Sequence, residues 1–171
     1  NFRAIDGIAE HTNLENNSVD LIVVAQAFHW FDKEKFKKEC KRILKPNGSV
    51  WILWNQLDEN KEIVKEQKKI DDQYTNRFQE VNGILSAAKK EEKLQGFFKD
   101  NQYETKIVDH PLENDKERFI GSNLSKSYSL KKEDENYDNY IKAFGEVFDK
   151  YCENGKVMIP NKTYGYLGKI N

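Results

Sequence analysis

Residues 19–32, VDLIVVAQAFHWFD, decide the fold of this chain. Their first half, 19–25, is a nearly continuous apolar run that ends in a small residue. That pattern is typical of a strand covered on both faces by helices. From Gln26 onward the sequence changes abruptly to Gln, His, Trp and Asp. Because ligands of open α/β sheets bind just beyond the carboxyl ends of parallel strands, this stretch predicts a binding site directly after Ala25.

The sequence that follows predicts a strand–helix–strand unit. Asp32 is a good N-cap, and residues 33–44 place apolar side chains on one helical face. The KPNG sequence of residues 45–48 ends that helix, and residues 49–55, SVWILWN, form a second strand. A helix between two such strands favours a right-handed crossover, and therefore parallel strands.

The remaining elements complete an α/β pattern. Residues 2–6 are a strand candidate, and residues 58–92 repeat apolar side chains at helical spacing. The further expected elements are a strand at 103–110, a short helix at 115–120, an amphipathic helix at 133–152, and a last strand over 156–159 and 164–167. The last two strands are expected to lie antiparallel at the edge of the sheet.

The bulk composition limits the class of protein. With 171 residues, 37% of them hydrophobic, the chain has the size of one domain. Its net charge of −1 gives no attraction to nucleic acid or to an acidic membrane surface. No apolar run reaches the roughly 18 residues of a membrane span. Cys40 and Cys152 lack metal-binding spacing. We interpret them as reduced thiols of a cytoplasmic protein with no metal, nucleic-acid or membrane partner.

Several short motifs follow one another along the chain. They are Gly7-x-Ala9-Glu10, Asn17-x-Val19-Asp20, Gln26-Ala27-x-His29-Trp30-Phe31-Asp32, Arg42-x-Leu44-Lys45-Pro46-x-Gly48, Trp54-Asn55, Ser125-x-Ser127-Tyr128 and Thr163-Tyr164-Gly165. This series resembles the class I S-adenosylmethionine-dependent methyltransferases. Within them it is similar to the small-molecule branch (type 11 methyltransferase domain) related to trans-aconitate methyltransferase. The resemblance covers nearly the whole chain.

The resemblance implies an α/β fold with a partial Rossmann-like methyltransferase sheet, flanking helices and an antiparallel last strand pair. Residues 2–6, 19–25 and 49–55 would be strands three, four and five, and the last pair would be strands six and seven. Residues 1–171 would form a single truncated methyltransferase domain with a helical substrate-lid region at about 58–98.

The start of the chain leads to a further expectation. The chain begins with Asn1, and its one methionine is Met158. The family's glycine-rich cofactor loop and the acidic residue after strand two have no counterpart here. We therefore expect a longer protein with these features upstream, and an inactive segment when it stands alone.

The resemblance also assigns residues to the cofactor, S-adenosylmethionine. The backbone of Ile8, Ala9 and Glu10 would meet the adenine edge. Ala25 and Gln26 would lie beside the methionine part, with backbone carbonyls near its ammonium. From the residues alone, the first segment is equally explained as a strand-to-loop turn, and the second as a polar loop before a helix.

His29, Trp30, Asn55 and Tyr128 are the candidate residues around the methyl acceptor. His29 is the candidate catalytic base, and Trp30, Asn55 and Tyr128 are candidates for substrate binding. The alternatives are structural. Trp30 packs under the following helix, His29 hydrogen-bonds a loop, Asn55 caps the next helix, and Tyr128 lies in an ordinary serine-rich turn.

The function that the resemblance implies is methyl transfer from S-adenosylmethionine to a small-molecule acceptor, mainly by positioning the reactants and excluding water. Two other functions stay open. One is a non-catalytic methyltransferase-like fragment that self-associates as a homodimer through the exposed edge of the strand at 19–25. The other is a nicotinamide-dependent oxidoreductase on a similar sheet, which would need a glycine-rich turn upstream.

Overall fold

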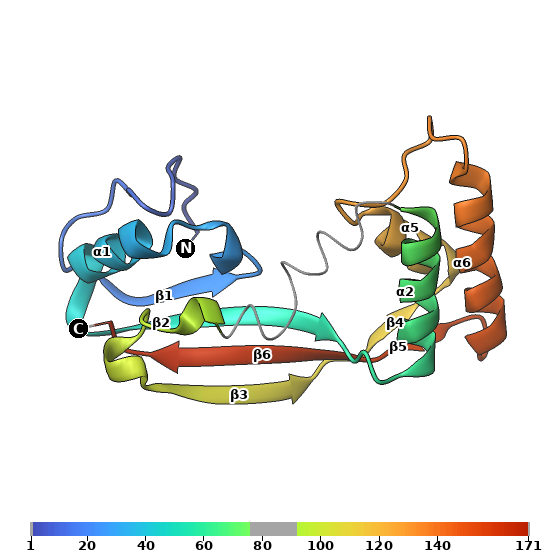
Figure 1. The fold of residues 1–171 in the computed structure, drawn as a ribbon. Helices are drawn as coiled ribbons and strands as arrows, with labels where there is room; N and C mark the ends of the chain where they lie inside the picture. The colour runs from blue at the N-terminus through green and yellow to red at the C-terminus, as the bar shows by residue number, and fades with distance from the viewer. Residues whose placement is uncertain (1, 76–91, 171) are drawn as a thin grey trace. The chain divides into compact units, whose positions relative to one another are not determined.

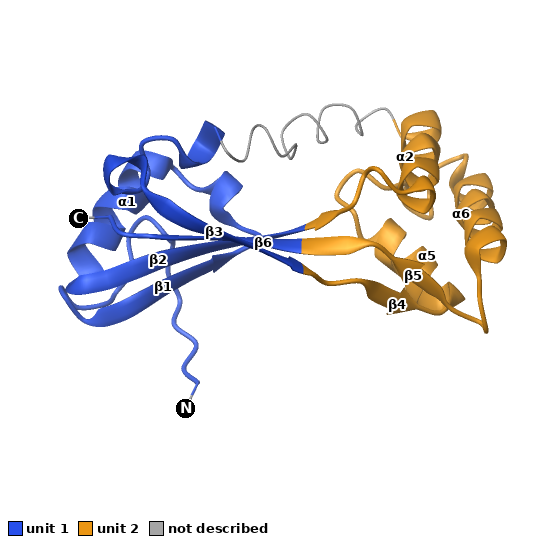
Figure 2. Cartoon of the chain, turned by 90° about the horizontal axis from the view of Figure 1, so that it is seen from below, with its two compact units in different colours: residues 1–55, 86–108, 163–171 blue, residues 56–85, 109–162 orange. Residues whose placement is uncertain are grey.

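The computed structural model of the 171-residue chain describes residues 2–75 and 92–170. The chain divides into two compact units (Figure 2). Unit 1 comprises residues 1–55, 86–108 and 163–171, and unit 2 comprises residues 56–85 and 109–162. In the described part of the chain, no helix is both long enough and apolar enough to cross a membrane.

The predicted single domain with a substrate lid at about 58–98 stays a prediction. The helix α2 (Glu62–Tyr74) lies in this stretch, as its apolar spacing predicts, while residues 76–91 lie outside the described residues.

Unit 1 is based on a four-stranded sheet with the order β1-β2-β6-β3. Its strands are β1 (Val19–Ala25), β2 (Leu44–Leu57), β6 (Asn161–Gly168) and β3 (Tyr103–Asp109). β1 and β2 run parallel, whereas β6 runs opposite to its neighbours β2 and β3 (Figure 1). The predicted α/β fold with an antiparallel last strand pair is therefore confirmed.

The predicted crossover helix is α1 (Lys33–Ile43), which connects β1 to β2. The carboxylate of Asp32 caps it by accepting a hydrogen bond from the backbone N–H of Lys35 at 3.1 Å. The helix ends where Leu44 turns to extended backbone. The strand begins here, earlier than expected, and residues 45–48 take up a shift of register against β1.

The core of unit 1 is an aromatic cluster on one face of the sheet. Phe28, Phe36 and Phe97 contact one another, with ring centroids between 4.7 and 6.2 Å apart. Phe28 lies in the 3-10 helix η1 (Phe28–Trp30), and a second one, η2 (Lys99–Asn101), follows the 97–98 segment. The sheet contributes Val24, Val50, Ile52, Trp54 and Tyr166 to the cluster.

The prediction that β1 is covered on both faces is wrong. Leu21 and Val23 keep 47% and 51% of their surface exposed, whereas Val24 keeps 5%. Successive strand residues point to opposite faces, so the exposed pair shares one face and Val24 points to the other. α1 and the aromatic cluster cover the face of Val24. β1 is also the outermost strand of the described sheet.

Residues 2–6, the expected strand three, form no strand. None of the strands described in the structure pairs with them, and Phe2 and Ile5 are exposed. Without ladder hydrogen bonds or burial, nothing offsets the conformational entropy that an ordered strand costs.

Unit 2 packs α2, α5 (Lys116–Leu124) and α6 (Tyr137–Tyr151) around one apolar cluster. α6 buries Tyr140, Phe144 and Val147, as its amphipathic pattern predicts, although it starts later than residue 133. The short helix predicted at 115–120 is α5, and Asp115 caps it by accepting a hydrogen bond from the backbone N–H of Arg118 at 2.8 Å.

The predicted last strand is split between two sheets. β5 (Val157–Ile159) pairs antiparallel with β4 (Leu112–Asn114) in a small sheet of unit 2, whereas β6 begins at Asn161 and joins the large sheet. Pro160 lies between them and has no backbone N–H to donate, so a continuous ladder is interrupted at this point.

Replacing Phe97 by Ala tests the core of unit 1. Phe97 is fully buried in the aromatic cluster, so F97A should lower the free energy of unfolding by about 3–5 kcal/mol. The three tryptophans of the chain, Trp30, Trp51 and Trp54, all lie in unit 1. Tryptophan fluorescence during urea denaturation therefore reports on this unit. Ile107→Ala, at an exposed position of β3, is the matched control and should cost less than about 0.5 kcal/mol. Equal losses for the two variants would contradict the described core.

Candidate functional site

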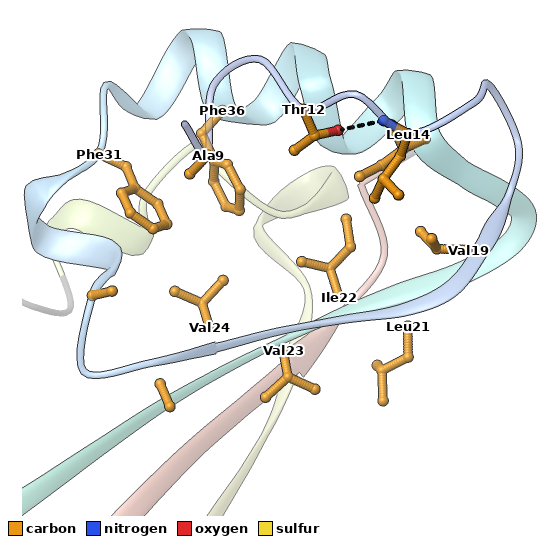
Figure 3. A pocket seen from close by; sticks show the side chains of 13 residues that line it. Ala9, Thr12, Leu14, Val19, Leu21, Ile22, Val23, Val24, Phe31 and Phe36 are labelled. Carbon is orange, nitrogen blue, oxygen red and sulfur yellow. Dashed lines mark hydrogen bonds between the residues drawn. The ribbon is translucent and has the colours of Figure 1, made fainter. Parts of the chain in front are cut away.

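A cavity of about 450 Å³ lies along β1 and beyond its carboxyl end (Figure 3). Its walls come from the loop before β1, from β1 itself, from η1 and its flanks, and from α1. The lining residues are Ala9, Thr12, Leu14, Val19, Leu21, Ile22, Val23, Val24, Ala25, Ala27, Phe31, Phe36 and Ile43. Thr12 contributes a hydroxyl, and every other side chain of this lining is apolar. The cavity therefore suits a flat or extended group with large apolar surfaces.

The loop before β1 contributes Ala9 to the cavity. The isolated bridge between Ile8 and His11 shapes this loop, with the backbone N–H of His11 donating to the Ile8 carbonyl at 3.1 Å. The side chain of Glu10 accepts a hydrogen bond from the backbone N–H of Asp32 at 2.8 Å, which ties the loop to the start of α1. Ala9 thus lines the cavity, while Ile8 is exposed and Glu10 serves a structural contact.

The carboxyl end of β1 places Ala25 in the same lining as Ala9. Gln26 follows with a φ of +57°, a left-handed conformation that strains a residue with a Cβ. Its backbone N–H donates to the carbonyl of Leu53 at 2.9 Å, and its side chain donates to the carbonyl of Asn55 at 3.4 Å. This sharp turn returns the chain to the cavity at Ala27. Strained backbone of this kind is concentrated at functional sites.

His29 and Trp30 lie side by side on η1, with ring centroids 4.7 Å apart. The carbonyl of His29 accepts a hydrogen bond from Lys93 Nζ, which fixes the backbone here. Trp30 is 72% exposed, so it does not pack under α1. It therefore presents an indole face to solvent next to a partly buried imidazole.

Asn55 does not cap the next helix, because the N-cap position of α2 is Lys61. Its side-chain oxygen accepts a hydrogen bond from the hydroxyl of Thr163 at 2.7 Å, which connects β2 to β6. Gln26 and Asn55 are thus in contact, and both lie where strands of the sheet leave the core.

Tyr128 belongs to unit 2 and does not line the cavity. Its hydroxyl is 3.4 Å from Oδ2 of Asp71, and this oxygen also accepts a hydrogen bond from Lys126 at 2.6 Å. The other carboxylate oxygen, Oδ1, accepts a hydrogen bond from the hydroxyl of Tyr140 at 2.6 Å. Burial, together with the Asp71 charge, raises the pKa of Tyr128. The phenol is therefore neutral at ordinary pH and acts as a hydrogen-bond donor.

Sequence reasoning missed Asp71, which is 1% exposed. An available signal is its position, four residues after Gln67 and three before Tyr74, within the apolar stripe of α2. A charged residue on a buried stripe needs a partner from elsewhere in the fold. Sequence reasoning also missed Glu39 on α1, whose side chain is 5% exposed.

Glu39 and Arg42 form an ion pair beside the cavity wall, with a shortest distance of 2.7 Å. The Arg42 hydrogen bonds, against the effect of burial, lower the pKa of Glu39 from 4.5 to about 2. Glu39 is therefore ionised at any ordinary pH, and a permanent charge pair stands next to Thr12.

The comparison with known families finds a match in the part of the chain that forms the cavity. Residues 2–52 match the family described as a methyltransferase domain, and every lining residue of the cavity lies within that range. This match covers 51 of the 171 residues of the chain. The cavity is therefore built entirely from the segment of the chain that matches this family.

Relatives in sequence agree with this assignment. A methyltransferase-like protein of Schizosaccharomyces pombe is 43% identical over 68 residues, which are 40% of this chain and 27% of that protein. A methyltransferase of Mycobacterium bovis is 42% identical over 67 residues, 39% of this chain and 28% of that protein. Both are described as uncharacterised. The chain thus spans little more than a quarter of these relatives' length.

Solved structures extend the likeness to the whole fold. A type II methyltransferase of Anaeromyxobacter dehalogenans has a TM-score of 0.57 at 16% identity and covers 96% of this chain and 70% of its own. A methyltransferase from an antibiotic biosynthesis pathway of Anabaena variabilis has a TM-score of 0.54 at 16% identity, with 94% and 71% covered. The predicted Rossmann-like methyltransferase fold is confirmed. The trans-aconitate branch is not distinguished by these matches and stays a prediction.

Removing the charge of Asp71 tests the cluster around Tyr128. In Asp71→Asn the ammonium of Lys126, whose side chain is 22% exposed, loses its counter-charge. We expect the free energy of unfolding of unit 2 to fall by about 3 kcal/mol, as for other buried pairs that lose one partner. Helical circular dichroism during urea denaturation measures this loss.

Asp149→Asn is the matched control for this prediction. Asp149 also pairs with a lysine of unit 2, Lys116 at 2.7 Å, but both side chains are exposed. Its loss should cost at most about 1 kcal/mol. A similar loss in the free energy of unfolding for both variants would show that the buried cluster stabilises unit 2 no more than an exposed ion pair does.

Proposed function

We propose that this protein is an S-adenosylmethionine-dependent methyltransferase that acts on a small-molecule acceptor in the cytoplasm. The cavity along β1 carries the proposal, because the segment that matches the methyltransferase domain builds all of it. Ala9 and Ala25, which sequence reasoning assigns to the cofactor, share its lining. Oxidoreductase chemistry has no comparable support in these matches.

The residues present fit the apolar parts of the cofactor. An adenine ring is flat and apolar on both faces, and the cavity offers Ile22, Val24 and Phe31 as apolar surfaces. Ala9, Ala25 and Ala27 have the smallest side chains of the lining, so backbone at these points can approach a ligand closely. The Thr12 hydroxyl adds one polar contact. We assign the adenine edge to the Ile8–Glu10 backbone and the methionine part to Ala25 and Gln26.

When bound, this cofactor supplies a methyl group on a positively charged sulfur, which is already a good leaving group. The work of the chain is then to orient the donor and acceptor and to exclude water, and positioning alone contributes up to several kcal/mol. The exposed indole of Trp30 can face a cation, an attraction of about 0.5–2 kcal/mol that grows as water is removed.

The role of His29 depends on the chemical class of the acceptor. A carboxylate needs no base, because it attacks in its ionised form. A hydroxyl or an amine must lose a proton, which the imidazole of His29 can accept. We assign Asn55 and Tyr128 to substrate binding through their amide and hydroxyl groups, both of which are held by neighbouring side chains.

We also propose a homodimer through the edge of β1. The support is that β1 is the outermost strand of the described sheet and exposes Leu21 and Val23. Light scattering coupled to size-exclusion chromatography measures the mass of the assembly, and a monomer at all concentrations would contradict this assignment.

Filling the cavity tests the proposed cofactor site. Isothermal titration with S-adenosylhomocysteine should detect binding to the natural gene product that contains this chain. Ala9→Phe should weaken it at least tenfold, about 1.4 kcal/mol, because the larger ring occupies the lining. Ala4→Phe, at an exposed position outside the lining, should bind as the wild type does. Failure of the natural protein to bind would refute the methyltransferase assignment.

Changing His29 to Gln separates the two acceptor classes. With a hydroxyl or amine acceptor, we expect kcat to fall by about 10²–10⁴-fold, because the proton acceptor is gone. With a carboxylate acceptor, kcat should stay within a few-fold of the wild type. Methyl transfer from radiolabelled S-adenosylmethionine measures both. The control is His110→Gln, in unit 2 and outside the cavity. An unchanged rate with every acceptor would remove His29 from the reaction.

A further inference from the structure

We propose that Glu39 and Arg42 are positioning residues for the cofactor. Together they clamp the loop at residues 12–16 to α1 and so fix one wall of the cavity along β1. This inference rests on the proposed function, since it names what holds that site in shape.

Glu39 holds the loop at Thr12. Its Oε1 accepts hydrogen bonds from the backbone N–H of Thr12 at 2.7 Å and from the Thr12 hydroxyl at 2.5 Å. The same oxygen accepts from Arg42 Nη2 at 2.7 Å, and Oε2 accepts from Arg42 Nε at 2.9 Å. The pairing of carboxylate and guanidinium is thus bidentate, which fixes both side chains in orientation.

Arg42 holds the rest of the loop. Its Nη1 donates to the carbonyl of Leu14 and to the side-chain oxygen of Asn16, each at 2.8 Å. Its Nη2 also donates to the carbonyl of Thr12 at 3.2 Å. Two backbone carbonyls and one backbone N–H of the loop are therefore hydrogen-bonded in this network. A neutral side chain of α1 would not provide these partners.

The clamp acts on the cavity because its partners are lining residues. Thr12 and Leu14 both belong to the wall of the cavity (Figure 3). Between Thr12 and Leu14 the loop's own contact is long, with the N–H of Leu14 at 3.4 Å from the Thr12 hydroxyl. The end of the loop is held by α1 backbone, since the N–H groups of Asn17 and Ser18 donate to the carbonyls of residues 42 and 43. The position of the wall is set from α1 and follows Glu39 and Arg42.

The two residues depend on each other. Glu39 is 5% exposed, and the Arg42 side chain is 34% exposed. Removing either one leaves the other without its charge partner beside the cavity, which is strongly unfavourable for a buried group. Arg42 is the first residue of the 42–48 motif, and Glu39 lies one helical turn before it.

The test measures the clamp and the cofactor separately, in the natural gene product that contains this chain. Hydrogen exchange should show the amide of Thr12, which donates to Glu39, protected in the wild type and at least tenfold faster in Arg42→Ala. The amides of Asn17 and Ser18, which donate to backbone carbonyls of residues 42 and 43, should change less. In titration, Arg42→Ala should bind S-adenosylhomocysteine at least tenfold more weakly, and its KM for the cofactor should rise with kcat little changed. Millimolar guanidinium ion should restore part of the affinity by taking the place of the lost side chain.

Two controls separate positioning from general loss of stability. Phe98→Leu destabilises the buried cluster of unit 1 without touching the loop or the cavity, and should bind as the wild type does. Asp20→Asn breaks the exposed ion pair of Asp20 with Lys45, at 2.9 Å, and should change neither exchange nor binding.

The outcomes are distinguishable. Unchanged exchange of the Thr12 amide in Arg42→Ala overturns the clamp, and so does an equal loss of affinity in Arg42→Ala and Phe98→Leu. If the wild type binds no S-adenosylhomocysteine, the proposed function fails, and the exchange result alone decides whether the pair holds the loop.

Discussion

The parallel pairing of β1 with β2 is the constraint on which unit 1 depends. Parallel neighbours need a crossover, and α1 supplies it while covering the inner face of both strands. This arrangement forces the chain to leave β1 at Ala25 and to turn sharply at Gln26 before it can enter α1. The cavity exists because this turn and the loop before β1 meet on the same side of the sheet. No other described element fills the space above the β1 side chains there.

Each unit uses one buried acidic residue to attach a loop to a helix. In unit 1, Glu39 holds the loop at Thr12, and in unit 2, Asp71 binds Lys126 and Tyr140. Both carboxylates receive several donors, which is the condition under which a buried charge is tolerated. In both units the side-chain contacts add to the backbone hydrogen bonds that hold the loop.

The strand–helix–strand unit of β1, α1 and β2 can be predicted from the sequence because its signals are local. The apolar run of β1, the Asp32 cap and the start of α1 all depend on neighbours within a few residues, and each is found as expected. Predictions that needed a distant partner were less successful. Residues 2–6 have strand-like composition but no pairing strand in the described chain, and the last strand divides at Pro160 between two sheets. Composition says that a segment can be a strand, and only the presence of a partner makes it one.

The site was predictable to a similar extent. The assignment of Ala9 and Ala25 to one location follows from a family resemblance, and the cavity does bring them together. Glu39 was not found because a glutamate in a lysine-rich helix looks like part of a solvated face, and nothing nearby in the sequence reveals that Thr12 lies against it.

Gly165 shows how a sequence motif and the packing in the structure are interpreted together. It belongs to the Thr163-Tyr164-Gly165 motif of the family resemblance, and a Cβ at this glycine would lie 2.7 Å from Nε1 of Trp51. The glycine is therefore required for the packing of β6 against the Trp51 side chain on β2. The neighbouring Thr163 instead reaches Asn55, so of this motif the threonine contacts the candidate site and the glycine maintains the sheet beneath it.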